Sequence, residues 1–189
     1  MFRRLIGTLA LAGLAATAHA AFTVDQLMTQ LAQHPGGRVK FVERRYLAVL
    51  DRPLIATGEM TYAPPDLLEK RTLTPTPEIL RLDHDRLVVE HGRRRLAIDL
   101  ASRPEALAFV DSVRSTLAGD REALERNYRL NLSGSPDQWV LTLTPTAPRI
   151  AALLRLITVG GSEDRISTID YLLTDGDRTE ITILPIESK

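Results

Sequence analysis

The residue types that carry most metal and redox chemistry are scarce in this chain. It has no cysteine and only four histidines. Three of them, His34, His84 and His91, follow the first 20 residues, and none stands near a second histidine at the spacing of a metal motif. Asp83-His84-Asp85 has ligand-type side chains, but a solvated turn between two strands explains the tripeptide better. We therefore expect no metal site and no cofactor.

Nucleophilic and phosphate-binding motifs are also missing from the sequence. Ser133-Gly134-Ser135 and Gly160-Gly161-Ser162 have turn composition, without the strand-to-helix elbow that exposes a catalytic serine. No glycine-rich loop precedes a helix as it does in nucleotide-binding proteins. Asp175-Gly176-Asp177 could pair two carboxylates, yet a tight hairpin turn favours the same residues. We expect that the protein is not an enzyme, and an acyl-transfer or hydrolytic enzyme is the weakest alternative.

The first 20 residues have the pattern of a secretory signal peptide. Arg3 and Arg4 precede an apolar run over residues 5–16, and Ala18-His19-Ala20 supplies the small residues of a cleavage site. The run is too short to span a bilayer as a helix. We predict cleavage after Ala20 and a periplasmic location, with residues 21–189 forming one domain.

Removal of this leader leaves 169 residues, with 22 basic and 24 acidic side chains. The resulting charge of −2 lacks the basic excess of a nucleic-acid-binding protein. A chain of this length can build its own hydrophobic core without disulfides. Without a cysteine there is no lipid-attachment site, so we expect a soluble protein whose contact with membranes is transient.

Apolar and polar residues alternate over most of the chain with the period of two that is typical of strands. We expect strands over residues 38–50, 54–62, 67–73, 78–82, 86–90 and 93–100, and then over 128–132, 139–143, 153–159, 165–173 and 178–184. Turn residues recur between them, and Asp175-Gly176 predicts a hairpin between the last two. The pattern predicts an α+β fold with an antiparallel sheet of about 10 or 11 strands.

Helical segments interrupt this pattern at two places. Thr23 and Gln26 have the spacing of a capping box at the start of a helix over residues 22–34. A second helix is expected from about residue 102 to Gly119, followed by a short one over residues 121–127. A single sheet that curls around the inserted helices would bury both sets of apolar faces.

The order of these elements, together with several local stretches, resembles the LolA/LolB family of periplasmic lipoprotein carriers. Phe41-Val42-Glu43 opens the long strand as a Phe-x-Gln/Glu start does in that family. TGEMTYAPPDLLEKRT (residues 57–72) resembles the family's glycine, apolar and proline signature. The other similar stretches are ILRLDHDRLVV (79–89), WVLTLTP (139–145) and ISTIDYLLTDGDRTEITI (166–183). The resemblance implies an incomplete, half-open β-barrel with a helical lid over an apolar cavity, and transport of an acylated cargo from an inner-membrane donor to an outer-membrane acceptor.

Two features depart from the family's pattern. The carriers have an arginine next to the signature proline, which helps to hold the lid shut, whereas Tyr62 and Ala63 precede Pro64 here. The family's chaperone also has a further C-terminal segment, whereas this chain ends soon after Ile183. The missing cysteine argues against the lipid-anchored receptor of the family. We therefore expect a divergent LolA-related carrier, of the kind found in fatty-acid or aryl-polyene export systems.

Alternation along the expected strands assigns one face of each to the cavity wall. The assigned residues are Ala56, Met60, Tyr62, Leu80, Leu82, Leu96, Ile98, Leu130, Trp139, Leu141 and Leu143. The helix over residues 102–118 is expected to cover the cavity with Phe109, Val110, Val113 and Leu117.

Residues 93–95 are three consecutive arginines, and two interpretations of their role are open. They could contact an anionic head group or a partner, or form a charged strand edge that discourages aggregation. The main alternative to a carrier is an envelope sensor or interaction module that binds a partner protein or lipid without transporting it.

Overall fold

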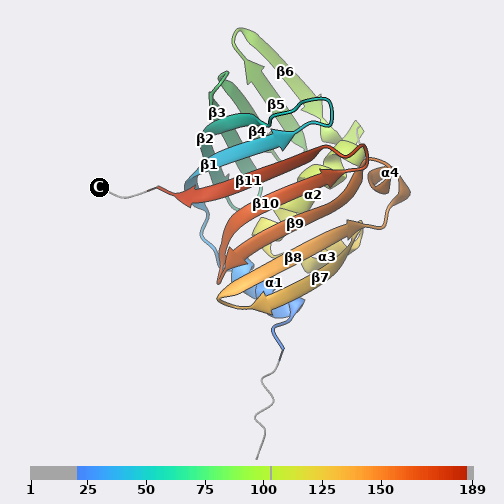
Figure 1. Ribbon diagram of the computed structural model, residues 1–189. Helices are drawn as coiled ribbons and strands as arrows, with labels where there is room; N and C mark the ends of the chain where they lie inside the picture. Colours follow the sequence, from blue (N-terminus) through green and yellow to red (C-terminus); the bar gives the residue numbers. More distant parts are fainter. Residues whose placement is uncertain (1–20, 103, 187–189) are drawn as a thin grey trace, which may run out of the picture.

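One antiparallel sheet of 11 strands, in the order β6-β5-β4-β3-β2-β1-β11-β10-β9-β8-β7, dominates the computed structural model (Figure 1). The structure describes residues 21–102 and 104–186, without the side chains of residues 104–106, 108 and 109. The predicted signal peptide lies outside these residues. The two edge strands β6 and β7 are not paired with each other, so the curved sheet remains open. The predicted α+β fold with an incomplete barrel is confirmed.

The strands are joined as a meander in each half of the sheet. The first half contains β1 (Gly37–Tyr46), β2 (Leu54–Ala63), β3 (Leu67–Thr74), β4 (Glu78–Asp83), β5 (Arg86–His91) and β6 (Arg94–Asp99). The second half contains β7 (Tyr128–Ser135), β8 (Gln138–Pro145), β9 (Leu154–Ser162), β10 (Arg165–Leu173) and β11 (Arg178–Pro185). Pairing of β1 with β11 joins the halves, with Phe41 opposite Ile183.

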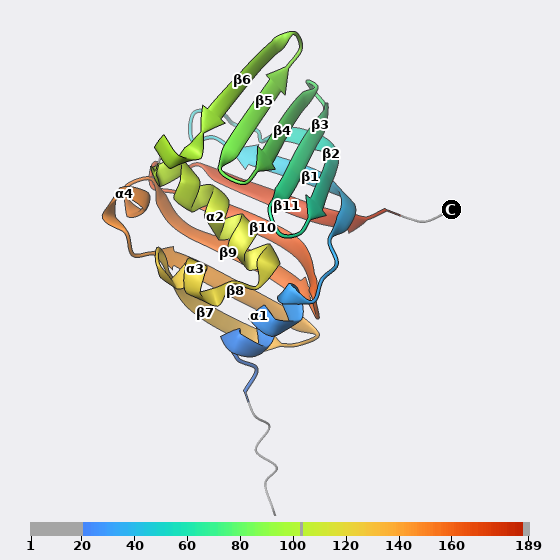
Figure 2. The same cartoon turned by 180° about the vertical axis from the view of Figure 1, so that it is seen from behind.

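The helices lie on the concave side of the sheet, except for the short helix over residues 148–151, which lies at the end of the sheet (Figure 2). They are α1 (Val24–Ala32), the 3-10 turn η1 (Leu100–Ser102), α2 (Pro104–Ala118), α3 (Arg121–Glu125) and, between β8 and β9, α4 (Pro148–Ala151). The predicted capping box at Thr23 and Gln26 begins α1. No helix in the described part of the chain is long and apolar enough to cross a membrane.

A glycine allows α1 to approach the end of α2 closely. Gly119 ends α2 in the left-handed region, with φ +66°, where glycine is favoured. A Cβ at this position would lie 2.1 Å from the backbone oxygen of Met28 in α1. Any other residue would therefore push α1 and α2 apart.

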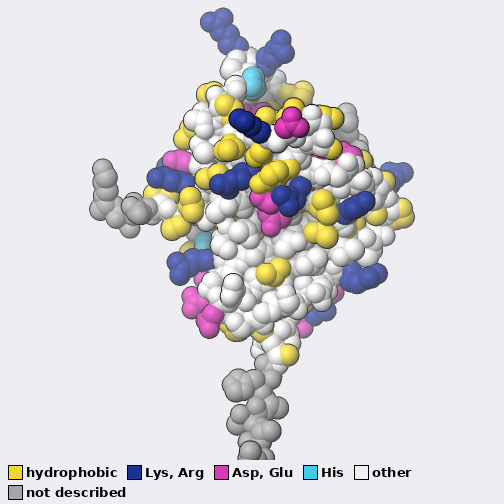
Figure 3. Space-filling model, viewed as in Figure 1, with side chains coloured by type: hydrophobic (Ala, Val, Ile, Leu, Met, Phe, Trp, Pro, Cys, Tyr) yellow, Lys and Arg dark blue, Asp and Glu magenta, His cyan; other side chains and the backbone are white. Residues whose placement is uncertain are grey.

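The solid hydrophobic core sits at the β7–β9 end of the sheet. Trp139, Leu141 and Leu143 of β8 are fully buried there, in one cluster with Leu27 of α1 and Leu124 of α3. The indole nitrogen of Trp139 donates a hydrogen bond to the backbone oxygen of Glu163, 3.0 Å away. The convex face of the sheet instead carries intermixed apolar and charged side chains (Figure 3), and its exposed apolar residues include Ile55 and Leu184.

Several element boundaries differ from the sequence prediction, and two of the differences have a clear local cause. The first strand ends at Tyr46 rather than at residue 50, because Leu50 donates a backbone hydrogen bond to the Leu47 oxygen and turns the chain. The connection before β9 contains α4, with Pro148 in its first turn, where the missing N–H is tolerated.

Candidate functional site

A cavity of about 850 Å³ lies between the concave face of the sheet and α2. Its size falls within the range of small-molecule binding sites, roughly 300–1,000 Å³. Strands from both halves of the sheet contribute to the wall, and α2 closes one side. The apolar part of the wall includes Met60, Leu68, Leu80, Leu82, Leu87, Val110, Val113, Leu117, Ile169, Ile181 and Ile183.

Part of the expected site lies in this cavity. Met60, Tyr62, Leu80 and Leu82 line its wall, and α2 contributes Val110, Val113 and Leu117. The side chain of Phe109, the fourth residue expected on the lid, lies outside the described part of the structure. Whether these residues bind a ligand remains a prediction.

The expected positions on β8 require correction, because α1 and α3 cover that end of the concave face. Trp139, Leu141 and Leu143 are fully buried in the core and do not line the cavity. Leu130 of β7 packs, half-buried, against the same core. Alternation along a strand identifies the face of the sheet, but not the part of that face that a helix fills.

The remaining positions also lie away from the cavity wall. Ala56 is buried on β2, between neighbouring strands, and does not line the cavity. Leu96 and Ile98 stand on the edge strand β6, beyond the cover of α2, and the Leu96 side chain is 58% exposed. An edge strand has a neighbour on one side only, so its side chains reach solvent more easily.

Strands β10 and β11 also contribute to the cavity wall, although the sequence predicted no cavity residue on either strand. Ile169 and Tyr171 of β10 and Ile181 and Ile183 of β11 line the cavity. Their alternation was visible, but it does not reveal that β11 pairs with β1. That pairing places the last strand directly beside the first half of the sheet, so that its side chains face the same cavity.

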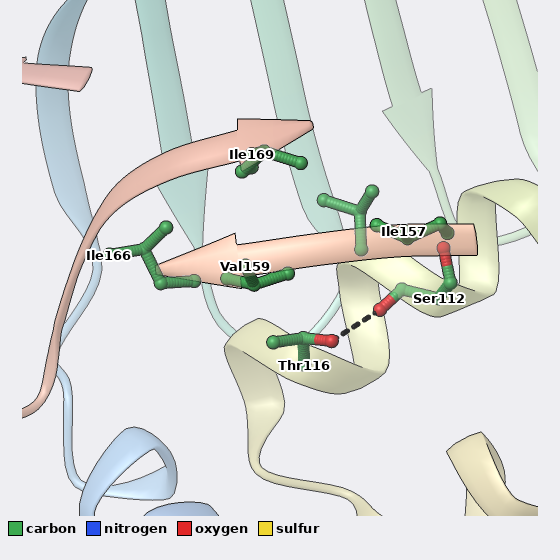
Figure 4. A pocket seen from close by; sticks show the side chains of 7 residues that line it. Ser112, Thr116, Ile157, Val159, Ile166 and Ile169 are labelled. Atoms are coloured by element: carbon green, nitrogen blue, oxygen red, sulfur yellow. Dashed lines mark hydrogen bonds between the residues drawn. The ribbon is translucent and has the colours of Figure 1, made fainter. Parts of the chain in front are cut away.

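The helix α2 packs on β9 and β10 through small polar side chains (Figure 4). Ser112 and Thr116 face Ile157 and Val159 across a gap of about 10 Å³, which holds at most one water molecule. The Thr116 hydroxyl donates a hydrogen bond to the backbone oxygen of Ser112 at 2.6 Å. This bond satisfies the buried hydroxyl within the helix, so the contact with the sheet is purely van der Waals at Thr116.

On the other side of the cavity, Arg114 connects α2 to two strand turns. One guanidinium nitrogen donates a hydrogen bond to the backbone oxygen of His84 at 3.0 Å. The second nitrogen lies 2.5 Å from Asp111 and 3.5 Å from Asp85, and Asp66 is 3.9 Å from the first. The arginine side chain is only 19% exposed, so solvent screens these contacts less than it screens a surface pair.

His84 lies in the turn that Arg114 contacts. Its hydrogen bond with Asp83, followed by the charge of Asp66, raises the pKa of the imidazole above its ordinary value. Within the described residues, no group of three or more His, Asp or Glu side chains converges closely enough to hold a metal ion.

The cavity wall also contains charged groups. Glu43 of β1 is buried to 6% exposure of its side chain, in contact with Lys70 and Arg45. Tyr171 lines the wall close by, and burial, with the added effect of the Glu43 charge, raises the pKa of its phenol well above the ordinary value. The phenol is therefore neutral at every physiological pH.

Comparison with known proteins gives a family match and several similar folds. The family model described as outer membrane lipoprotein carrier protein LolA-like matches residues 15–185. A LolA superfamily protein from Nitrosomonas europaea is 10% identical, with a TM-score of 0.45, and the match covers 89% of this chain and 96% of that one. No match is found among the curated proteins.

Two further solved structures are similar to this chain to about the same degree. A putative outer membrane lipoprotein-sorting protein domain from Vibrio parahaemolyticus is 12% identical, with a TM-score of 0.42, covering 85% of this chain and 88% of that one. A chain in the MucA/MucB complex of Pseudomonas aeruginosa is 13% identical, with a TM-score of 0.46, covering 88% of this chain and 59% of that one.

Proposed function

The chain belongs to the LolA-like family of outer membrane lipoprotein carrier proteins, and from this premise we propose that it binds the acyl chain of a lipid or lipidated molecule in its cavity. The proposal includes export to the periplasm and transfer of the cargo from an inner-membrane donor to an outer-membrane acceptor. No chemical step is part of it.

The observation that carries the proposal is the apolar cavity of about 850 Å³ under α2. Each methylene removed from water contributes about 0.8 kcal/mol, so a chain of roughly 15 carbons gains on the order of 10 kcal/mol. Ordering the chain offsets several kcal/mol of this gain. A bilayer offers a similar gain, so uptake and release lie near balance.

The first experiment compares two neighbouring residues of β11 that face opposite sides of the sheet. Ile183 lines the cavity, whereas Leu184 is 43% exposed on the convex face. We expect Ile183→Asp to weaken the binding of a fluorescent acyl probe at least about tenfold, because the new carboxylate must be desolvated. Leu184→Asp should bind as the wild type does.

The same titration distinguishes the alternatives. Leu68→Asp, on the opposite part of the wall, provides a second cavity variant if Ile183→Asp does not fold. Unchanged probe affinity in both folded variants would contradict the cavity assignment. Lipid that binds but does not move between vesicles would favour a sensor, and a chemically altered lipid would favour an enzyme.

A further inference from the structure

One charged cluster interrupts the apolar wall of the cavity. Its members are Glu43 and Arg45 on β1 and Lys70 on β3, and all three line the cavity. Arg45 Nε lies 3.2 Å from one carboxylate oxygen of Glu43, and Lys70 Nζ donates to the other oxygen. The Lys70 ammonium also lies 5.0 Å from the ring centroid of Phe41, within the range of a cation–π contact.

The fold brings these residues together across an intervening strand. Glu43 pairs with Ala56 of β2, and Lys70 pairs with Met60 on the other side of that strand. Gly58 stands between them, and a Cβ there would lie 2.9 Å from the ring of Phe41. The absence of a bulky side chain at positions 56 and 58 leaves Lys70 room to cross β2 and reach Glu43.

The cluster carries more positive than negative charge. Among the described residues, the ion pairs of Lys70 and Arg45 are both made with Glu43, so two cations share one carboxylate. Glu69, another acid of the wall, is already paired with Arg71 at 3.1 Å and Arg81 at 3.7 Å. Lys70, at 23% side-chain exposure, is the less solvated of the two cations, so an anion beside it would replace part of its lost hydration.

The cluster extends from the cavity wall to the solvent. The Lys70 side chain is 23% exposed and the Arg45 side chain 54%, so the charges lead from the cavity wall out to solvent. An ammonium has three hydrogen-bond donors and a guanidinium has five, which exceeds what one carboxylate accepts. A second anion therefore fits at the boundary between the apolar wall and water.

We propose that Lys70 and Arg45 hold the anionic head group, a carboxylate or a phosphate, of an amphiphile whose hydrocarbon chain fills the apolar part of the cavity. This inference rests on the proposed acyl-binding function and narrows the cargo to anionic amphiphiles. Glu43 keeps the two cations in place while the site is empty and competes with the bound head group, which keeps release possible.

The test uses the protein without residues 1–20 and three probes that are all derivatives of a 16-carbon chain. Hexadecanoate and hexadecyl phosphate are the anionic probes, and methyl hexadecanoate is the neutral one. We expect at least one anionic probe to bind about tenfold more tightly than the ester, since hydrogen bonds to charged groups are the stronger ones. The more tightly bound of the two anions identifies the head-group chemistry.

The variants separate a binding role from a structural one. Lys70→Met should remove the preference for the anion, whereas Glu43→Gln should tighten binding of the anion by up to about tenfold because its competitor is gone. The affinity of each variant for the ester is the reference, and the anion is compared with it as a ratio. Arg44→Met, at a half-buried arginine on the opposite face of β1, is the matched control and should leave the affinity ratio unchanged.

The outcomes are distinguishable. If Lys70→Met does not fold, Arg45→Met and Glu43→Gln carry the test. Equal affinity of the wild type for ester and both anions, or an unchanged ratio in Glu43→Gln, would overturn this inference but leave acyl binding intact. Absence of binding of all three probes would instead contradict the proposed function itself.

Discussion

Asp170 is a single residue whose charge opposes folding. It lies opposite Glu180 of the neighbouring strand β11. Burial, followed by the charge of Glu180, raises the pKa of its carboxyl, while Arg178 acts in the opposite direction. A raised pKa means that the folded state binds this proton more tightly than the unfolded chain does, so the free energy of unfolding falls as the pH rises past the usual value.

We therefore expect Asp170→Asn to raise the melting temperature at pH 7 and to have no stabilising effect near pH 3, where the carboxyl is protonated in both states. Thermal unfolding followed by circular dichroism between these pH values measures the effect. Asp51→Asn, at an exposed loop position, serves as the control. Equal changes for both variants at all pH values would contradict this account of Asp170.

A second residue-scale prediction concerns Gly161, which lies opposite Trp139. A Cβ at Gly161 would lie 2.4 Å from Trp139 Cζ2 and 2.3 Å from the backbone oxygen of Arg165. We expect Gly161→Ala to lower the free energy of unfolding by about 2 kcal/mol or more, because the indole is fully buried and cannot move away. Urea denaturation measures this loss.

The neighbouring glycine provides a matched control. A Cβ at Gly160 would meet mainly the hydroxyl oxygen of Thr168, at 2.6 Å, which belongs to a side chain that can rotate. Gly160→Ala should therefore cost less stability than Gly161→Ala. A larger loss at Gly160 would show that the indole is not the obstacle.

At the scale of elements, the Arg114 contacts predict how α2 is held over the cavity. Replacing Arg114 with Met removes its bonds to the His84 oxygen and to Asp111 and Asp85. We expect a loss of roughly 1–3 kcal/mol in the local stability of α2, typical of partly buried hydrogen bonds to a charged group. Hydrogen exchange of α2 amides, followed by mass spectrometry, measures it, and acyl probes should enter the variant faster.

Arg121→Met is the control for this experiment. Arg121 contacts Asp25 at 2.6 Å and Glu125 at 2.8 Å, but its side chain is 40% exposed. Solvent screens such a surface pair, so its removal should change the exchange of α2 amides little. Unchanged exchange of α2 in Arg114→Met would show that packing on β9 and β10 alone holds the helix.

Local patterns were sufficient to predict most elements, but not how distant elements meet. The capping box at Thr23 and the hairpin at Asp175-Gly176 depend on neighbouring residues, and both are present. The positions of Trp139 and Ile183 depend instead on which helix covers β8 and on the pairing of β11 with β1. Residues that alternate identically in the sequence therefore end in a solid core or in a cavity wall.

On the scale of the whole molecule, the solid part of the core and the cavity occupy adjoining parts of the sheet, and Ile169, Tyr171 and Ile181 belong to both. The β7–β9 end, under α1 and α3, is filled by Trp139, Leu141 and Leu143. The cavity lies over β1–β5, β10 and β11, where side chains leave space.

The pairing of β1 with β11 has a consequence for how the chain matures. β1 begins at Gly37 and β11 ends at Pro185, so the middle of the sheet joins segments that are synthesised first and last. Contacts of such large sequence separation slow folding. Until the final strand arrives, one side of β1 presents unpaired backbone groups, which invite aggregation. A chain that stops before residue 178 should therefore accumulate in insoluble form.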